Sequence, residues 1–472
     1  MKARGKPCFL AVLVLLALLT GRPLAMWAQK TASATDEKAV KTAESEKLPP
    51  PAPAPGFFPL GMPASPVSNL DLGSLTTTSG PITGPLAPYG RAAASEAIWQ
   101  DWRGHRLGAL KAAPFLEYDA LYRSNVFRSS TGKQADWVHA VNPGLRLVLP
   151  LGPHRLSLNY LGNYFLFSRF SHLSHDDHNF SATAVLDFPR GLTIRLGYAF
   201  RAASEEPSTE HARLRPYRRH TPYVQAVFHP TDKWQVKGFY QFDALEFDKG
   251  VDKSSTFREH AGGVMLHYRF WPKTGALIQY IITSRTYPGS PQDDSLVHTP
   301  LAGFTWNPTA KLSNTLKFGI SLVNYRRKLP GRDNSPEHVI LSLQTVYRYG
   351  RRTLLTLTVQ RSKQDDVDFG NRPFWHTGIF LALKHEWHYF RLTTYATFSF
   401  INNSYLNRAW EAASGTFKRR EDNIFYVGAG LSRPLNRWLR LRLDWRYLDD
   451  SSNFSGFSYT DHQVLAGLKT AI

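Results

Sequence analysis

The stretch WLRLRLDWRY, residues 438–447, alternates two kinds of side chain along one run. From its third residue on, the even positions carry Arg440, Arg442, Asp444 and Arg446, whereas the odd positions carry leucine, tryptophan and tyrosine. A period of two, with charge on one face and large apolar groups on the other, predicts a β-strand between two unlike environments. In a soluble sandwich the apolar face would contact a second sheet. In an outer-membrane barrel it would contact lipid, and the charged face would line a wet lumen.

Residues 1–28 have the pattern of a secretory signal peptide. Basic residues at positions 2, 4 and 6 precede an uninterrupted apolar run over 9–19, and small residues follow near 25–28. The only cysteine, Cys8, lies inside this segment. After cleavage the chain would therefore hold no disulfide and no thiolate metal site.

Residues 29–114 have a composition that cannot bury a core. A mixture of lysine, glutamate, alanine and threonine passes into PPPAPAPG at 49–56, and proline, glycine, serine and threonine dominate as far as residue 89. We expect a mostly disordered, proline-rich periplasmic leader, with a short helix over 92–110. Three roles remain open for it: a docking segment, a plug inside a barrel, or a flexible leader.

Residues 115–472 are expected to form strands joined alternately by tight and by long connections. Tight turns, most of which contain proline or glycine, are predicted at 150–153, 188–191, 229–234, 271–274, 306–309, 349–352, 386–389 and 433–438. Longer polar connections are predicted at 128–137, 169–177, 202–218, 248–256, 288–295, 326–336, 363–372, 402–420 and 449–458. Eight turns and nine loops predict an all-β fold: a transmembrane, antiparallel, up-and-down β-barrel of about 18 strands, with short periplasmic turns and long extracellular loops.

The aromatic residues and the end of the chain fit the same interpretation. Tryptophans occur at five of the tight turns, where an interfacial girdle belongs: Trp234, Trp271, Trp306, Trp387 and Trp438. After the signal no run offers the roughly 18 uninterrupted apolar residues that a membrane helix needs. Outer-membrane barrels usually end in an aromatic residue that the barrel-assembly machinery reads, and Ile472 departs from that rule. We still expect this machinery as a partner, and the outer membrane as the location.

The net charge of the chain is concentrated in its β-rich part. Of the +20 total, residues 1–28 carry +4 and residues 29–114 carry +1, which leaves +15 for residues 115–472. This excess favours a polyanionic partner, such as an acidic glycan or the phosphates of lipopolysaccharide, and membrane lipids surround any such barrel. Nucleic acid is not expected for an exported chain. The alternative is that the basic residues only solubilise the loops.

Three stretches resemble a known family. FLEYDALYRSNVFR (115–128), YLGNYFLFSRFSHLSHDDHNFSATAVLDF (160–188) and SSNFSGFSYTDHQVLAGL (451–468) are similar to the opening, the second hairpin and the ending of β-barrel porin proteins encoded at bacterial exopolysaccharide and capsule loci. The resemblance covers residues 115–472 in layout. It implies an outer-membrane protein that assists the export of a polysaccharide, and it does not account for the leader or for Ile472.

The predicted functional surface is the lumen. Alternation directs a set of basic residues and one tyrosine inward: Arg146, Arg195, Arg201, Lys237, Arg391, Arg440, Arg442, Arg446 and Tyr395. Such arginines can pass a polyanion through individually weak bidentate contacts, and lumenal aromatics such as Tyr395, Phe239 and Tyr223 can stack on sugars. The alternative is that arginine and acid pair only to satisfy buried charge.

We therefore predict a conduit that assists export of an extracellular polysaccharide, with an acidic cargo favoured by the charge. Two alternatives are a general or solute-specific diffusion porin and an outer-membrane hydrolase. A hydrolase would need a set such as Ser458, Asp461 and His462, which forms no defining motif. HLSHDDH at 172–178 could hold a transition metal and the paired aspartates of the loops could hold calcium, but solvated side chains explain both. We predict no enzyme, no cofactor and no metal.

Overall fold

The computed structural model describes residues 105–209, 211, 213–248, 254–327, 337–366, 372–411 and 413–471. The expected signal peptide, most of the leader and Ile472 lie outside these residues. Within them the chain is built almost entirely of antiparallel strands. No helix in the described part is both long and apolar enough to cross a membrane.

Eighteen strands form the wall of a barrel in the described residues, and a short strand, β1 (His105–Leu107), precedes them. They are β2 (Leu110–Arg123), β3 (Asp136–Leu151), β4 (His154–Phe167), β5 (His175–Phe188), β6 (Leu192–Glu205), β7 (Arg215–Phe228), β8 (Trp234–Phe247), β9 (Phe257–Trp271), β10 (Thr274–Thr286), β11 (Ser295–Thr309), β12 (Leu312–Tyr325), β13 (Glu337–Tyr349), β14 (Thr353–Asp366), β15 (Arg372–Trp387), β16 (Leu392–Glu411), β17 (Thr416–Pro434), β18 (Leu439–Ser452) and β19 (Tyr459–Ala471).

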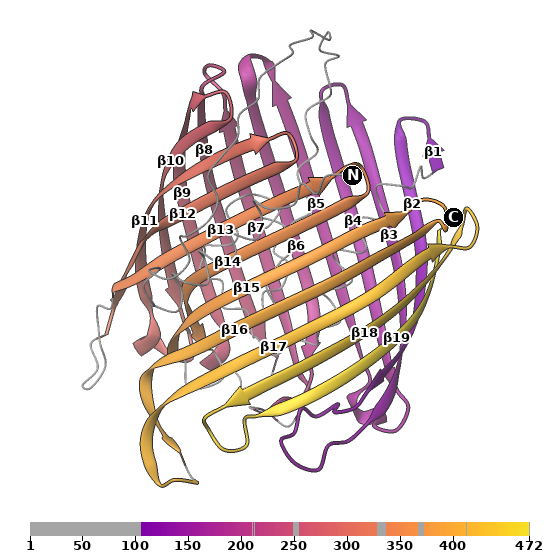
Figure 1. Cartoon of the computed structure of the whole chain (residues 1–472). Helices are drawn as coiled ribbons and strands as arrows, with labels where there is room; N and C mark the ends of the chain where they lie inside the picture. The colour runs from indigo at the N-terminus through magenta and orange to yellow at the C-terminus, as the bar shows by residue number, and fades with distance from the viewer. Residues whose placement is uncertain are drawn as a thin grey trace, which may run out of the picture. The chain divides into compact units, whose positions relative to one another are not determined.

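Pairing between the last strand and the first closes the wall. Each strand from β2 to β18 pairs antiparallel with the next, and β19 pairs with β2 from Gln463 opposite Arg123 to Ala471 opposite Phe115. Figure 1 shows the resulting barrel, in which β18 and β19 lie beside β2 and β3. Closure satisfies the backbone groups of every strand, which a sheet in lipid requires. The predicted barrel of 18 strands is confirmed.

The two ends of the barrel differ in the length of their connections, as predicted. Two residues join β3 to β4 and β11 to β12, whereas twelve residues separate β2 from β3. Gly152 and Gly350 take φ of +63° and +65° in two of the tight turns, a conformation that favours glycine. By the usual orientation of such barrels, the tight end is periplasmic and the long end extracellular.

Two predicted connections are misplaced. The loop predicted over 402–420 is largely strand, because Asn402 pairs with Asn423 and Glu411 pairs with Thr416 in an extended hairpin of β16 and β17. Polar residues occupy both faces there, so the sequence has the composition of a loop although the ladder continues. The turn predicted at 306–309 is also shifted, since β11 runs to Thr309 through an irregular register.

The N-terminal boundary of the barrel lies a few residues before the predicted one. β2 starts at Leu110 instead of residue 115. β1 pairs with β2, with His105 opposite Ala112, so the described end of the stretch expected to be helical forms a small hairpin instead. The rest of the expected helix lies outside the described residues.

The outer surface carries the apolar half of each strand. At the periplasmic turns Trp234, Trp271, Trp387 and Trp438 are 39%, 66%, 47% and 54% exposed, and Trp306 is half-buried. Indole rings in this position suit the boundary between acyl chains and water. The arrangement agrees with the predicted aromatic girdle.

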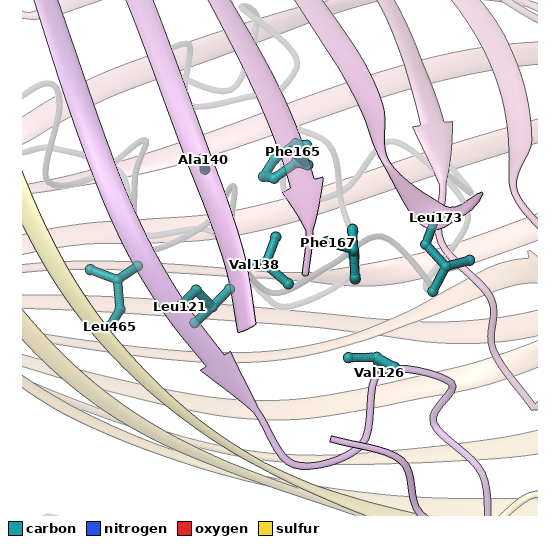
Figure 2. Packing of buried hydrophobic residues seen from close by; sticks show 8 residues of the cluster. All are labelled: Leu121, Val126, Val138, Ala140, Phe165, Phe167, Leu173 and Leu465. Atoms are coloured by element: carbon teal, nitrogen blue, oxygen red, sulfur yellow. The ribbon is translucent and has the colours of Figure 1, made fainter. Parts of the chain in front are cut away.

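A cluster of buried apolar residues lies inside the extracellular end. It consists of Leu121, Val126, Val138, Ala140, Phe165, Phe167, Leu173 and Leu465. Figure 2 shows these side chains gathered from the strands and from the connections beyond them, which include the short helix η2 (Ser171–Leu173). Leu214, from the connection after β6, packs against the same cluster. The connections after β2, β4 and β6 therefore pack against the inner face of the wall at this end.

Candidate functional site

The alternation of β18 directs its charged residues to the inner face. Arg442, Asp444 and Arg446 are 6%, 6% and 5% exposed, whereas the intervening Leu443 and Trp445 are both 43% exposed. In a barrel the exposed apolar positions face lipid, so the buried charged positions face the lumen. Arg440 shares their parity and is half-buried.

Three acidic and three basic residues meet on β18, β19 and β2, where the barrel closes. We call these six residues the seam cluster. They are Glu117, Asp119, Arg442, Asp444, Arg446 and Lys469. Arg442 lies 3.2 Å from Glu117, 3.3 Å from Asp119 and 3.0 Å from Asp444. Arg446 lies 3.4 Å from Asp444, and Lys469 lies 3.7 Å from Glu117. Each acid in the cluster contacts a base, which is the arrangement that makes buried charge tolerable.

Tyr395 extends the seam cluster from β16. Its hydroxyl donates a hydrogen bond to Oδ1 of Asp444. The ring lies over Gly430 of β17, where any Cβ would be within 2.6 Å of it. A glycine at this point thus lets the ring lie against the wall.

A second group of ion pairs lies on the inner face of β7 to β10. Nε of Arg219 donates to Oδ1 of Asp243 at 2.8 Å, and Nε of Arg285 donates to Glu259 at 2.8 Å. A second guanidinium nitrogen of each arginine also contacts its acid. Arg219, Arg285 and Glu259 were not among the predicted lumenal residues. Their parity along the strands would have placed them in the lumen.

Four further predicted residues also lie on the inner face. Arg201 is 3.4 Å from Asp177 of β5, and Lys237 of β8 is 6% exposed. Arg195 lies opposite the buried Gln225 of β7, and Arg146 lies opposite Asn159 of β4. These four belong to different parts of the wall from the seam cluster, so the predicted residues do not form one continuous row.

Arg391 is not a lumenal residue, and its predicted orientation is wrong. It lies in the turn between β15 and β16, exposed, with φ of +48°, and its backbone N–H donates to the carbonyl of His388. The alternation of β16 starts only at Leu392. Extending the period of two by one residue into the turn produced the error.

Buried ion pairs also occur at the extracellular end of the lumen. Nη1 of Arg123 lies 2.5 Å from Oε2 of Glu206, and Nε of Arg123 lies 3.5 Å from Asp461. Burial by itself would raise the pKa of the Glu206 carboxyl. The charges of Arg123, His175 and Arg128 outweigh that effect, so the pKa of Glu206 lies below its usual value. Glu206 is therefore held as a carboxylate.

Two other aromatic side chains proposed for sugar stacking lie flat against the wall. Tyr223 covers Gly197 and Phe239 covers Gly263, so that a Cβ on either glycine would overlap the ring. Both rings belong to a buried apolar cluster with Ile281, Leu301 and Ile340. They fill space on the inner surface of the wall, as aromatic residues over strand glycines often do.

The candidate catalytic and metal-binding sets are not brought together. Asp461 faces inward to Arg123, His462 is exposed on the outer face, and the hydroxyl of Ser458 donates to the carbonyl of Ser452. His175 and His178 lie on opposite faces of β5, and no group of potential metal ligands occurs among the described residues. The predicted calcium ligands of one loop, the aspartates at 365, 366 and 368, have side chains that lie outside those the structure describes.

Solved structures of outer-membrane porins are similar in fold. The structure of Pseudomonas aeruginosa OpdK with vanillate has 11% sequence identity and a TM-score of 0.43, over 76% of this chain and 99% of the other. Acinetobacter baumannii OccAB4 has 12% identity and a TM-score of 0.43, over 77% and 99%. P. aeruginosa OccK2 (OpdF) has 11% identity and a TM-score of 0.44, over 77% and 98%. No curated protein matches the sequence.

A family of porins matches by sequence. The family described as "Putative beta-barrel porin 2" matches residues 101–472, which include every described strand. Porins of this fold are typically channels and not enzymes. The closed barrel, its apolar outer face and this match lead to one conclusion: the chain belongs to the Putative beta-barrel porin 2 family and is an outer-membrane β-barrel protein.

Proposed function

We propose that the barrel is a diffusion porin for small polar or charged solutes. The single observation that carries this proposal is the pairing of opposite charges on the inner wall. The seam cluster contains three acids and three bases in mutual contact, and Arg219 and Arg285 each pair with an acid. A wall of paired charges offers polar contacts to solutes of either sign without holding one class tightly.

Export of a polysaccharide has less support. That interpretation required rows of arginines available to bind carboxylates or phosphates of a long polyanion. Arg201, Arg442 and Arg446 instead contact Asp177, Glu117, Asp119 and Asp444. A passing polyanion would have to displace these acids, which costs the favourable pair interactions.

The wider partners follow from the location. Membrane lipids surround the apolar outer face, and we propose that lipopolysaccharide of the outer leaflet and the barrel-assembly machinery are further partners. We propose no cofactor and no nucleic acid.

Planar-bilayer recording with the full-length protein tests the proposed function. A diffusion porin gives discrete conductance steps in a simple electrolyte, and a long acidic polysaccharide added to one side leaves these steps nearly unchanged. A conduit for the polysaccharide would instead show blockades whose frequency increases with its concentration. Blockades of that kind would contradict the proposal and support export.

A further inference from the structure

One tyrosine–histidine contact is repeated five times on the barrel, and we call the set the tyrosine–histidine belt. In each pair the tyrosine Oη is hydrogen-bonded to the histidine Nδ1: Tyr118 with His139 at 2.7 Å, Tyr160 with His178 at 3.0 Å, Tyr198 with His220 at 2.8 Å, Tyr240 with His260 at 2.8 Å, and Tyr280 with His298 at 2.8 Å.

The five pairs share one position in the register. Tyr118 lies opposite Val141 and contacts the histidine two residues earlier, and Tyr240 lies opposite Gly262 and contacts His260 in the same way. The other three pairs follow this rule. Because β2 to β11 are consecutive neighbours in the sheet, the belt crosses ten adjacent strands.

The belt faces away from the lumen. Tyr118, Tyr240 and Tyr280 are 42%, 46% and 45% exposed, whereas the adjacent inward residues Asp119 and Gln241 are 0% and 3% exposed. In an outer-membrane barrel this face contacts lipid. The belt therefore presents hydrogen-bonding groups to the membrane.

The belt lies near the extracellular limit of the apolar band. His260 pairs with Phe242, eight residues beyond Trp234 on β8, and it precedes Trp271 of the periplasmic girdle by eleven residues on β9. At about 3.3 Å per residue and a tilt of about 40°, His260 lies roughly 20 to 28 Å above the girdle, and the apolar band is about 25 Å tall. Lipid headgroups of the outer leaflet begin at this depth.

The bond at Nδ1 fixes which nitrogen points outward. When the tyrosine donates to Nδ1, the neutral imidazole carries its proton on Nε2. A charged imidazole instead donates from Nδ1 to the tyrosine oxygen, and it also carries a proton on Nε2. His178 uses Nε2 to contact Asp176 at 2.7 Å. In the described part of the chain His139, His220, His260 and His298 have no second hydrogen bond. Their Nε2–H groups are donors available to lipid.

Positive charge flanks two of these donors. Arg218 and Arg258 lie two residues beyond His220 and His260 towards the extracellular side, on the same face of β7 and β9. Glu246 of β8 lies opposite Arg218 and is 3.5 Å from Arg258, whose side chain is 56% exposed. Two guanidinium groups and two imidazole donors thus face the membrane beside one carboxylate.

We propose that the tyrosine–histidine belt binds the phosphorylated headgroup of the outer-leaflet glycolipid, lipopolysaccharide, and that the strongest contact is made by Arg218, His220, Arg258 and His260. Guanidinium and imidazole N–H groups are the donors that phosphate oxygens accept best. The tyrosine rings lie below, against the acyl chains, and hold the histidines in orientation. This site is independent of what passes through the lumen.

Lipid exchange on the full-length protein tests the site. The protein in nanodiscs is offered lipid A with two phosphates or phosphate-free lipid A, and the bound fraction is measured by native mass spectrometry. The wild type should retain the phosphorylated form about tenfold more than the phosphate-free form. The variant His220→Phe/His260→Phe, or Arg218→Gln/Arg258→Gln, should remove most of that preference. His229→Phe/His388→Phe, at periplasmic turns, is the matched control and should retain it.

Two results would overturn the proposal. One is equal retention of the two lipids by the wild type, a comparison that requires no variant. The other is a wild-type lipid preference in the His220→Phe/His260→Phe variant, once heat-modifiable migration on a gel has shown that this variant is folded. If that double variant does not fold, Tyr240→Phe decides, because it removes only the hydroxyl that orients His260. A lipid preference unchanged in Tyr240→Phe would then refute the site.

Discussion

Arg123 and Glu206 form a buried ion pair of 2.5 Å although 83 residues separate them in the chain. Arg123 ends β2 and Glu206 follows β6, so the ion pair joins two parts of the wall that are separated by β3, β4 and β5 in the strand order. It fixes the start of the connection after β6 against the extracellular end of the wall. The apolar cluster of Figure 2, which includes Leu121, Val126 and Phe165, lies at the same end.

The pair predicts a loss of stability in acid. The pKa of Glu206 is lowered below its ordinary value of 4.5, so its contribution is fully present above pH 4.5 and is lost as the pH falls through the lowered value. The thermal midpoint of the wild type should therefore fall between pH 5 and pH 2 more than that of Glu206→Gln. Equal decreases in the two proteins would show that Glu206 does not contribute.

Removal of Arg442 should be strongly destabilising. Arg442→Leu leaves Glu117, Asp119 and Asp444 close together without their shared cation, and breaking a buried pair in this way costs about 3 to 5 kcal/mol. Urea unfolding in lipid vesicles measures the change. Arg391→Leu, in an exposed turn, is the control and should change the free energy of unfolding little. A comparable loss in both variants would contradict the seam cluster as a stabilising element.

Charge reversal at Arg195 should change ion selectivity. Arg195 is half-buried on the inner face of β6, so Arg195→Glu should shift the reversal potential of the wild-type channel towards cation preference. Arg391→Glu makes the same change of charge outside the lumen and should leave the reversal potential unchanged. A selectivity shift of equal size in both variants would disprove the assignment of the inner face.

The apolar cluster predicts one further effect. Phe165 is 4% exposed, so Phe165→Ala should cost about 3 to 5 kcal/mol of unfolding free energy through lost packing and a residual cavity. Leu166→Ala, on the adjacent lipid-facing position that is 53% exposed, should cost less. Unfolding in lipid vesicles compares the two, and a larger effect at Leu166 would contradict the packing of the cluster.

Local alternation made the barrel predictable from sequence, and its failures have specific causes. A period of two identifies faces wherever one side is lipid and the other is polar, which is why Arg442 was placed correctly. The rule fails at Arg391, where the strand has already ended, and over 402–420, where β16 and β17 extend with polar residues on both faces.

Local sequence patterns could not predict which charged residues form ion pairs with one another. Arg442 contacts Asp119 across 323 residues because β19 closes on β2, and no local pattern encodes that closure. The tyrosine–histidine belt did have a signal: its tyrosines recur at 118, 160, 198, 240 and 280, about one hairpin apart. This spacing of one residue type at the hairpin period is visible in the sequence.

Solute efflux from proteoliposomes tests the central claim most directly. Vesicles containing the full-length protein are loaded with a size-graded series of sugars and small charged solutes, together with a long acidic polysaccharide. If the barrel is a diffusion porin, small solutes of both signs escape at rates that fall with size, while the polysaccharide is retained. Escape of the polysaccharide, or retention of every small solute, would contradict this claim.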